Sequence, residues 1–506
     1  MRGVTDTHPA PLLAPDDLAR LREALVRARY TSTGIAERIG APAVEAVRRN
    51  DFRALLRATT DGDPLATLVR VFIAGQTEPE AAVAAALGPL PLDAALEAGL
   101  VERYGDGIHA GVDLDIYGEA ATGSGDAEWW VLSDLDADAR PGPLRTDHVL
   151  GIGNAATTLA GATVRRPVGT ALDLGTGCGV QALHLSRHAA RVTATDLSDR
   201  ALRFAATTAA LNGVEWELLA GDMLAPVAGR RFDLVVSNPP FVVGPGSTRY
   251  TYRDSGRAGD RVCAELAGAA GDLLTEGGTL QFLANWLHVT GEDWHDRVAG
   301  WFAGTGCDAW VIQREVSDPV EYVNLWLRDA AEAFDPRRAE AWLDWFAAEK
   351  VEAVGFGLVT LRRSPHPTPV VRLEDLRHSV PPPFGPHVAE WFDRQDWLAA
   401  HPGPALLDAP LRRADGLRLT QEAGFDGADW DVERQVLTMS TGLRWAEEVD
   451  PLVLALVSGA DGRVPLRDQL AVLAAAYETP EPVLAAMAVP IVAHLVERGL
   501  LVPAGR

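Results

Sequence analysis

The fold of this chain is decided by the stretch Leu172-Asp173-Leu174-Gly175-Thr176-Gly177-Cys178-Gly179. It begins as an apolar strand, passes through a turn with three glycines and leads into a predicted helix over 180–186. Glycine lets the backbone approach a ligand closely, and a helix N-terminus adds unpaired N–H groups. The spacing G-x-G-x-G differs from the dinucleotide-binding form G-x-G-x-x-G. The stretch therefore predicts a strand–turn–helix unit that holds a small ligand.

Short apolar strands alternate with amphipathic helices on both sides of this unit, from residue 126 to residue 365. Such alternation predicts an α/β domain with a parallel, doubly wound sheet. A tryptophan-containing helical stretch, at about 318–350, is expected to be inserted before the last strand and to cap the substrate cleft. The predicted strands are 170–174, 191–195, 216–219, 232–237, 278–283, 309–312 and 355–361, with 129–132 as an extra strand ahead of the domain.

The two ends of the chain have a different, mainly helical pattern. Residues 1–120 end in two short extended runs, 100–104 and 108–114, and helices followed by a two-stranded hairpin are the outline of a winged helix. A proline-rich stretch at 364–369 and 381–383 predicts either a linker or a segment that lies along the surface. Residues 366–506 end in helices at 450–457, 467–477 and 481–497 with an extended run at 500–502. We therefore expect three domains, 1–120, 126–365 and 366–506, the outer two resembling winged helices.

Composition limits the classes of protein. A length of 506 residues suggests about three domains, and a net charge of −24 argues against non-specific coating of nucleic acid. Residues 20–57 hold nine arginines and four acids, which indicates either an RNA surface or, as slightly favoured, a solvated helix face with ion pairs. The sequence shows no secretory signal and no apolar run of about 18 residues, so a cytoplasmic protein without a membrane span is expected.

Metal binding is not predicted. Cys178, Cys263 and Cys307 form no metal motif and are expected to be free thiols. His184 and His188 lie four residues apart on the helix after the glycine turn. Because no third ligand accompanies them, they are predicted to lie on a helix surface.

Acidic residues follow the next two strands. Asp196 ends the second strand, 23 residues after Asp173, where a carboxylate can accept hydrogen bonds from ribose hydroxyls. The third strand is followed by Gly221-Asp222-Met223. Three such features at three successive strand tips indicate a nucleoside-containing ligand.

The tip of the fourth strand carries Asn238-Pro239-Pro240-Phe241. The two prolines remove two N–H donors, so carbonyl oxygens and the side-chain oxygen of Asn238 remain as acceptors for both hydrogens of a planar amino group. This would aim the nitrogen lone pair at an electrophile by positioning alone. Phe241 can stack on a flat amide or base. The tetrapeptide therefore predicts the reactive centre.

These motifs resemble those of class I S-adenosylmethionine (SAM)-dependent methyltransferases of the "small domain" Asn-Pro-Pro-Phe/Tyr type. That group includes glutamine methyltransferases of release factors, guanine-N2 methyltransferases of ribosomal RNA and adenine-N6 methyltransferases. The resemblance implies a Rossmann-like, seven-stranded domain and SAM as methyl donor, with Asp173 facing the SAM ammonium and Asp222 the adenine amino group. It implies catalytic roles for Asn238, Pro239, Pro240 and Phe241, and SAM contacts for Asp173, Gly175, Thr176, Gly177, Cys178, Gly179, Asp196, Leu197, Asp222 and Met223.

The acceptor remains open at this point. The segment Gly256-Arg257-Ala258-Gly259-Asp260 resembles the release-factor branch, whereas Phe241 is more typical of the ribosomal RNA guanine branch. Arg249, Arg253, Arg257 and Arg261 would either meet phosphate or solvate a loop. We expect N-methylation of a macromolecule of the translation apparatus, either an rRNA or tRNA base or a glutamine of a protein such as a release factor. A small-molecule N-methyltransferase and a SAM-binding regulatory protein are the alternatives.

Overall fold

The computed structural model describes residues 9–123, 125–136, 144–329, 335–425 and 427–504. They form two compact units, Met1–Arg377 and His378–Arg506. No helix within the described ranges is both long enough and apolar enough to cross a lipid bilayer.

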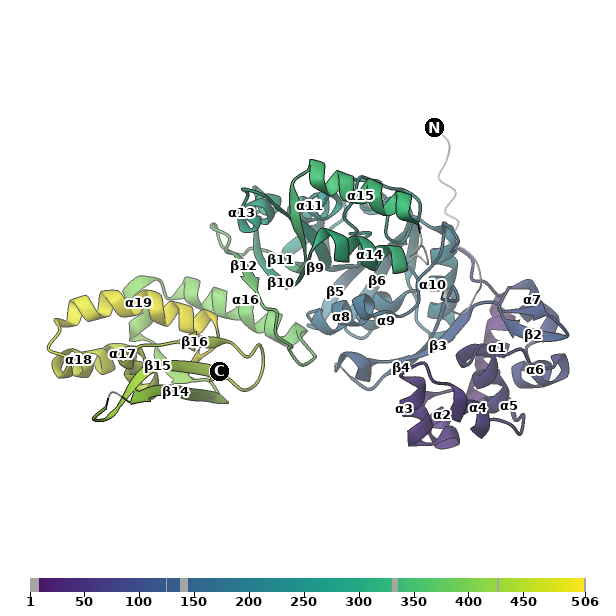
Figure 1. Ribbon diagram of the computed structural model, residues 1–506, viewed down its shortest axis with the longest axis horizontal. Coiled ribbons are helices and arrows are strands. Elements are labelled where there is room, and N and C mark those ends of the chain that lie inside the picture. Colours follow the sequence, from purple (N-terminus) through teal and green to yellow (C-terminus); the bar gives the residue numbers. More distant parts are fainter. Residues whose placement is uncertain (1–8, 124, 137–143, 330–334, 426, 505–506) are drawn as a thin grey trace. The chain divides into compact units, whose positions relative to one another are not determined.

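A central sheet of eight strands forms the middle of the first unit (Figure 1), in the order β12-β10-β11-β9-β8-β5-β6-β7. Neighbouring strands run parallel from β9 to β7, whereas β11 is antiparallel to both β9 and β10. The strands are β5 (Val168–Leu174), β6 (Ala189–Asp196), β7 (Glu217–Ala220), β8 (Phe232–Ser237), β9 (Leu274–Val289), β10 (Cys307–Ser317), β11 (Val351–Arg363) and β12 (Val371–Asp375). The predicted α/β class is confirmed, and each of the seven predicted strands lies on one of these elements.

The eighth strand, β12, lies in the segment that the sequence analysis treated as a linker. It pairs in parallel with Ala309–Gln313 of β10 and forms one edge of the sheet. Pro365, Pro367 and Pro369 all precede the strand, and proline is tolerated at the start of an edge strand because no ladder N–H is lost there. The first unit therefore extends to residue 377 rather than to residue 365.

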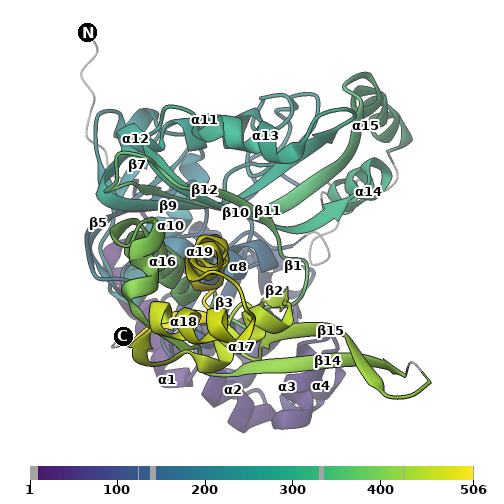
Figure 2. The ribbon, with the colours of Figure 1, turned by 90° about the vertical axis from the view of Figure 1, so that its left-hand side faces the viewer.

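Helices cover the two faces of the sheet (Figures 1 and 2). The longest, α10 (Asp199–Asn212), begins where the Ser198 side chain accepts from the Ala201 N–H, and it ends at Gly213 in the left-handed region. The helices α14 (Pro319–Asp329) and α15 (Pro336–Ala348) form the predicted insertion, between β10 and β11. The remaining helices are α8 (Asn154–Ala162), α9 (Val180–Leu185), α11 (Arg261–Gly268), α12 (Ala270–Leu273) and α13 (Trp294–Ala299).

The N-terminal part is helical and ends in a hairpin, as predicted. The predicted run 108–114 is divided, however, because Gly111 separates the hairpin from β3 (Asp113–Gly118), which pairs with β4 (Glu128–Ser133). Strand β4 packs on α10, and the Asn212 side chain bonds to the Trp130 backbone N and O. The other elements are α1 (Pro15–Ala28), α2 (Ser32–Ile39), α3 (Ala41–Val47), α4 (Arg53–Ala58), α5 (Pro64–Leu68), a π-helical turn (Val69–Ile73), α6 (Glu80–Leu87), α7 (Leu92–Glu97), β1 (Val101–Tyr104) and β2 (Gly107–Ala110).

The second unit contains the three helices predicted near the C-terminus, α17 (Pro451–Gly459), α18 (Leu466–Ala476) and α19 (Glu481–Glu497). It also contains a long, exposed hairpin of β14 (Leu417–Phe425) and β15 (Trp430–Met439), visible as an arm in Figure 2, which the sequence analysis did not predict. The other elements are α16 (Gly385–Ala400), β13 (Pro410–Arg413), β16 (Ala446–Glu448), β17 (Asp461–Pro465) and β18 (Leu501–Pro503). The strands β17, β13 and β18 form one small sheet, and the hairpin with β16 forms another.

Candidate active site

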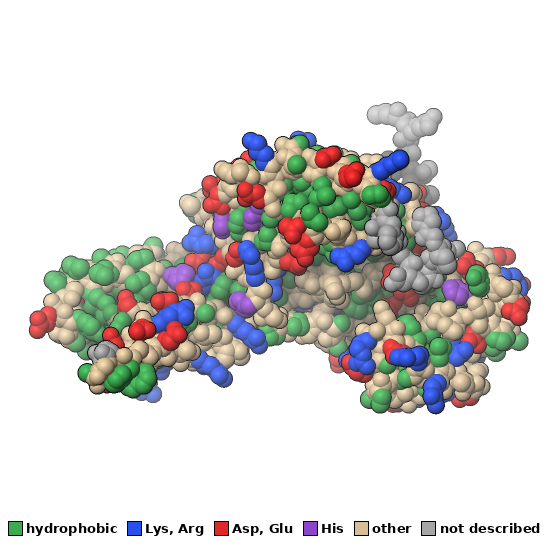
Figure 3. All heavy atoms as spheres, viewed as in Figure 1, with side chains coloured by type: hydrophobic (Ala, Val, Ile, Leu, Met, Phe, Trp, Pro, Cys, Tyr) green, Lys and Arg blue, Asp and Glu red, His purple; other side chains and the backbone are tan. Residues whose placement is uncertain are grey.

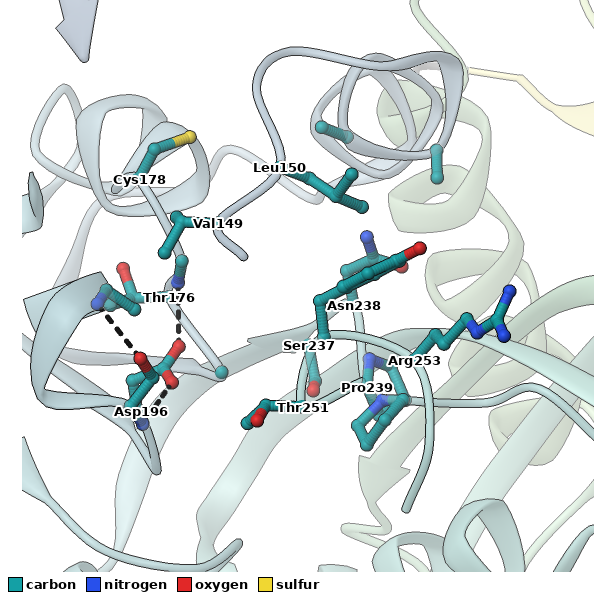
Figure 4. Close-up of a pocket in the computed structure, with 18 of the residues that line it drawn as sticks. Val149, Leu150, Thr176, Cys178, Asp196, Ser237, Asn238, Pro239, Thr251 and Arg253 are labelled. Carbon is teal, nitrogen blue, oxygen red and sulfur yellow. Dashed lines mark hydrogen bonds between the residues drawn. The ribbon is translucent and has the colours of Figure 1, made fainter. Parts of the chain in front are cut away.

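A cavity of about 560 Å³ lies at the carboxyl ends of β5, β6 and β8. These ends meet at one edge because the strands are parallel, which is where open α/β sheets bind ligands. In Figure 4, Asp196 and Thr176 lie at one end of the cavity, and Asn238, Pro239 and Arg253 lie at the other. Its volume is in the range of small-molecule sites.

The glycine turn forms one wall of the cavity. Gly175 and Gly177 have φ values of 77° and 55°, and a Cβ on either would meet no atom within 4 Å. A Cβ on Gly179 would instead lie 2.7 Å from the Trp216 ring. The first two glycines therefore leave open space where a ligand can approach the backbone, and the third permits packing behind the turn.

Asp196 holds this turn in place. Its Oδ2 accepts a hydrogen bond of 2.9 Å from the Gly177 N–H, and its Oδ1 accepts one of 2.8 Å from the Ser198 N–H (Figure 4). Burial raises the pKa of the Asp196 carboxyl. Each carboxylate oxygen can accept a second hydrogen bond, so the group remains able to bind hydroxyls of a ligand.

Asp173 lies behind the turn and is not one of the residues that line the cavity. It is 1% exposed, and its Oδ2 accepts from the Thr176 hydroxyl at 2.6 Å and from the Ala182 N–H at 3.0 Å. Its other oxygen has no hydrogen-bond partner among the described residues, and burial raises its pKa to about 7. The position of Asp173 thus fixes the turn against the start of α9. Asp173 and Gly179 are the two candidate site residues that lie outside the cavity wall.

The Asn238–Phe241 segment forms the opposite wall. The Ser237 hydroxyl donates to the Leu174 carbonyl at 2.8 Å, which fixes the end of β8 against β5. The Pro239 carbonyl accepts from the Phe241 N–H at 2.7 Å and keeps one lone pair. The Asn238 Oδ1 is buried and has no partner among the described residues. The segment therefore holds, in the wall of the cavity, two oxygen acceptors with unused lone pairs.

The helical insertion holds the chain directly after this segment. The Val243 N–H donates to the Tyr322 hydroxyl at 2.7 Å, and the Val243 carbonyl accepts from the Trp342 Nε1–H at 2.9 Å. Asn285 of β9 also donates to the Tyr322 hydroxyl. The insertion of α14 and α15 was predicted from the sequence as a cap over the cleft, but the roles of Tyr322 and Trp342 in holding Val243 were not predicted.

Two of the four arginines in the loop after the segment pair with acids of the protein, whereas Arg249 and Arg261 are exposed. Arg253 is 2% exposed and forms an ion pair with Asp254. Arg257 pairs with Glu265 at 2.5 Å and with Asp222 at 3.5 Å. These partners offset the positive charge that the sequence analysis considered for phosphate binding.

Asp260, which carries the resemblance to the release-factor branch, does not line the cavity. Its carboxylate pairs with Arg297 at 2.7 Å and accepts from the Leu287 N–H at 3.2 Å. The Gly259 N–H bonds to the Gly244 carbonyl. These contacts connect the Gly-rich segment to β9 and α13, which gives it a structural role.

The arginine cluster of 20–57 is also rich in ion pairs. Arg38 pairs with Asp61 at 2.5 Å, and Arg49 pairs with Glu45 at 2.9 Å. Figure 3 shows basic and acidic side chains side by side over these helices. The arrangement favours the interpretation as a solvated face of paired charges.

The prediction that His184 and His188 lie on a helix surface is wrong. His188 follows the end of α9, and both of its ring nitrogens are buried. His184 is on α9 but does not face solvent. The side chain is 1% exposed because β3 covers α9, and its Nε2 lies 2.8 Å from the Tyr117 hydroxyl. Arg165 is always a donor, so Nδ1 accepts from it at 2.9 Å and Nε2 carries the proton. Burial, followed by the charge of Arg165, lowers the pKa of His184 to about 3. No group of His, Cys, Asp and Glu suited to a metal ion occurs within the described residues.

Two further parts of the wall were not identified from the sequence. The segment 148–156 lines the cavity, and Figure 4 shows Val149 and Leu150 between its two ends. Asp113 and Asp115 of β3 line it as well. Burial and the neighbouring carboxylates raise the pKa of Asp113 to about 8. The alternation Asp113-x-Asp115, which puts both side chains on one face of a strand, was the available signal.

Comparisons with known proteins match three parts of the chain to three families. The family described as "Methyltransferase small domain" matches residues 152–291. Two families described only as domains of unknown function, DUF7059 and DUF7782, match residues 27–111 and 389–503.

Curated relatives match the central domain. The chain is 33% identical over 119 residues to a ribosomal RNA small subunit methyltransferase C of Serratia proteamaculans, covering 22% of this chain and 33% of that protein. It is 34% identical over 168 residues to the protein of the same name from Pasteurella multocida, covering 31% and 46%. The chain thus spans between a third and a half of the length of these relatives.

Solved methyltransferase structures resemble the chain only distantly. A T. thermophilus 16S rRNA methyltransferase in complex with AdoMet and guanosine has 19% identity and a TM-score of 0.25, covering 37% of this chain and 49% of that one. The assignment rests instead on the family match and the motifs at the strand ends. Residues 152–291 accordingly belong to the class I SAM-dependent methyltransferases of the small-domain type.

Proposed function

We propose that this protein is a SAM-dependent N-methyltransferase that acts on the exocyclic amino group of a base in ribosomal RNA. The observation that carries the proposal is the side-chain oxygen of Asn238, which is buried in the cavity wall without a hydrogen-bond partner among the described residues. A buried acceptor left unpaired costs about 1–3 kcal/mol. An amino group of the substrate would satisfy it.

The residues at the other end of the cavity fit SAM. The open space at Gly175 and Gly177 is a cradle that any Cβ would fill, and the Asp196 carboxylate keeps lone pairs for the two ribose hydroxyls. The proposed SAM contacts also include Asp222 and Met223, which line the cavity after β7. Further cofactor residues in this proposal are Thr176, Cys178 and Leu197 at the wall, with Asp173 and Gly179 supporting the turn from behind.

SAM would supply a methyl group bonded to a positively charged sulfur, and a nitrogen lone pair can attack that methyl carbon and displace the sulfur. The Asn238 oxygen and the free lone pair of the Pro239 carbonyl each accept one hydrogen of the amino group. With both hydrogens held in this way, the nitrogen lone pair would point out of the plane of the amino group toward the methyl carbon. The N–C bond forms as the C–S bond breaks, and one proton then leaves the nitrogen for water. Positioning, rather than a general base, supplies the catalysis.

A base of RNA is the proposed acceptor for two reasons. The relatives that match the central domain are named as ribosomal RNA methyltransferases. Phe241, which lines the cavity next to Pro240, offers an aromatic face on which a flat base can stack. Guanine N2 is the first candidate, since phenylalanine at this position is typical of the guanine branch.

The flanking parts, 1–120 and 378–506, are proposed as winged-helix-like modules that dock the substrate. Their paired surface charges suit contacts with a folded ribonucleoprotein better than with bare RNA. The cytoplasm is the proposed place of action, because ribosomal RNA is the proposed substrate.

The test is transfer of tritium from labelled SAM into ribosomes and ribosomal RNA of a strain that lacks this protein. We expect label that ribonuclease removes and protease leaves, and nucleoside analysis should find it in a methylated guanine. The Asn238→Ala variant should bind SAM but transfer no label. Label that survives ribonuclease and is lost with protease would refute the RNA acceptor, and absence of label in both fractions would refute a translation substrate altogether.

A further inference from the structure

Trp326 lies on the last turn of α14 and lines the same cavity as Phe241. The centroids of the two rings are 6.0 Å apart, and their planes are inclined by 70°. A base stacked on Phe241 would be nearly parallel to that ring, so the indole of Trp326 would be nearly perpendicular to the base. Its in-plane N–H, rather than its face, is then the group suited to contact the base.

The N–H of Trp326 lacks an acceptor within the described structure. Its Nε1 is buried and has no hydrogen-bond partner there. The neighbouring Tyr322 hydroxyl already accepts from Val243 at 2.7 Å and from Asn285 at 2.9 Å, which occupies both of its lone pairs. Burial raises the pKa of Tyr322, and the indole of Trp326 lies close enough to this hydroxyl to lower that pKa in part, but the hydroxyl is already engaged by two donors. Because indole nitrogen is a donor only, an acceptor on the substrate would complete its hydrogen bonding.

The position of Trp326 is fixed relative to the reactive segment. The buried Arg253 side chain donates to the Trp326 carbonyl, and the Tyr252 hydroxyl donates to Asp329 at 2.9 Å. Both contacts connect the end of α14 to the loop that follows Asn238–Phe241. A donor held in this way has a defined direction toward the acceptor site, which is the requirement for a specificity contact.

The three bases with an exocyclic amino group share one chemical unit, an amino group on a ring carbon that is double-bonded to a ring nitrogen. That nitrogen is unprotonated in each of them, and it is N3 of guanine, N1 of adenine and N3 of cytosine. Uracil has a ring N–H and no amino group in the corresponding place. A site with an acceptor for the amino group and a donor beside it matches the first three bases and rejects the fourth.

We propose that Trp326 determines specificity: its Nε1–H donates to the ring nitrogen beside the methylated amino group, while Asn238 accepts from the amino group itself. This inference rests on the proposed function and names the part of the base that the site recognises. From the sequence, Trp326 was predicted only as part of a helical cap over the cleft.

The test compares the unaltered protein with Trp326→Phe, which keeps an aromatic wall and removes the N–H. The control is Trp345→Phe, the same change on the neighbouring α15 at a residue that does not line the cavity. Binding of guanosine, adenosine and cytidine is measured by calorimetry in the presence of S-adenosylhomocysteine. Each nucleoside is paired with its analogue in which the ring nitrogen is a C–H (3-deazaguanosine, 1-deazaadenosine and 3-deazacytidine).

The unaltered protein and Trp345→Phe should bind the accepted nucleoside roughly tenfold more tightly than its deaza analogue. This ratio corresponds to the free energy that one neutral hydrogen bond contributes. Trp326→Phe should bind both members of the pair equally and should retain SAM affinity. The same discrimination in Trp326→Phe as in the unaltered protein, or no discrimination in either, would overturn the proposal.

The transfer assay separates this outcome from failure of the proposed function. If RNA is labelled but Trp326→Phe discriminates normally, the inference fails and the methyltransferase proposal stands. If a nucleoside binds in a manner that depends on Trp326 but no RNA is labelled, the proposed role of Trp326 is supported and the proposal of an RNA substrate is refuted. If no nucleoside binds and no RNA is labelled, both are wrong.

Discussion

The hydroxyl of Tyr322 accepts a hydrogen bond of 2.7 Å from the backbone N–H of Val243. The contact joins α14, the first helix of the insertion, to Val243, which lies two positions after Phe241. Because Trp342 binds the carbonyl of Val243 as well, the insertion controls both polar groups of this residue. The geometry of the reactive segment thus depends on a part of the chain about 80 residues away.

Removing this hydroxyl should affect catalysis more than cofactor binding. In Tyr322→Phe, the buried Val243 N–H and the Asn285 amide lose their acceptor, which should lower the free energy of unfolding by about 2 kcal/mol. Single-turnover methyl transfer should slow by roughly tenfold, the effect of a small misplacement of the acceptor. Denaturant unfolding, calorimetric SAM binding and rapid-quench kinetics measure the three effects.

Tyr104→Phe is the control, because Tyr104 is 64% exposed on the N-terminal hairpin. It should change none of these quantities. A Tyr322→Phe variant that lost SAM affinity in proportion to its rate would show that the insertion acts on the cofactor end of the cavity instead.

The glycine turn offers a matched pair of substitutions. Gly175 and Gly229 both have a φ of 77°, and a Cβ on either would meet no atom within 4 Å, but only Gly175 lines the cavity. Alanine at either position should lower the unfolding free energy by about 1 kcal/mol, because of the left-handed backbone. Only Gly175→Ala should weaken SAM binding, by at least roughly tenfold, in a calorimetric titration. Equal SAM affinity in the two variants would contradict the assignment of the turn as the SAM cradle.

The lowered pKa of His184 predicts that the folded protein loses stability in acid. Its pKa is lowered to about 3 in the folded protein by burial, whereas an unfolded histidine titrates near 6.5. The unfolded state therefore binds the proton first, and stability is lost as the pH falls from about 6.5 toward 3. Thermal unfolding of His184→Gln, which has no titrating group here, should depend less on pH over this range than that of the unaltered protein. Parallel curves would mean that His184 does not titrate with unfolding.

Periodicity predicted much of the central sheet. The seven expected strands could be predicted because each is an apolar run bounded by glycine, proline or polar residues, a signal contained in the local sequence. The β12 strand was missed because its pairing with β10 is non-local, and the prolines before it indicated a linker. The hairpin of β14 and β15 was missed because its exposed, mixed side chains lack the alternation that a buried face imposes.

The candidate site was likewise predicted only in part. Twelve of the fourteen candidate residues line one cavity because motifs at the ends of parallel strands meet at one edge of the sheet. The role of Asp173 could not be inferred from spacing, since only the structure shows that its carboxylate turns toward Thr176 and Ala182. The contributions of Tyr322, Trp342 and 148–156 depend on tertiary contacts with segments distant in the sequence.

The most direct test of the central claim is single-turnover transfer by Asn238→Ala and Asn238→Asp, with the SAM affinity of each variant measured in parallel. The claim is that the Asn238 oxygen orients the acceptor amino group, so both variants should bind SAM within about twofold of the unaltered protein. Alanine removes the acceptor oxygen and should slow transfer by at least roughly a hundredfold, which is about 2.7 kcal/mol of transition-state stabilisation. Aspartate keeps an acceptor oxygen at this position and should therefore transfer faster than alanine. Transfer by Asn238→Ala at the unaltered rate would contradict the account, because the buried side-chain acceptor assigned to the amino group would then have no part in the reaction.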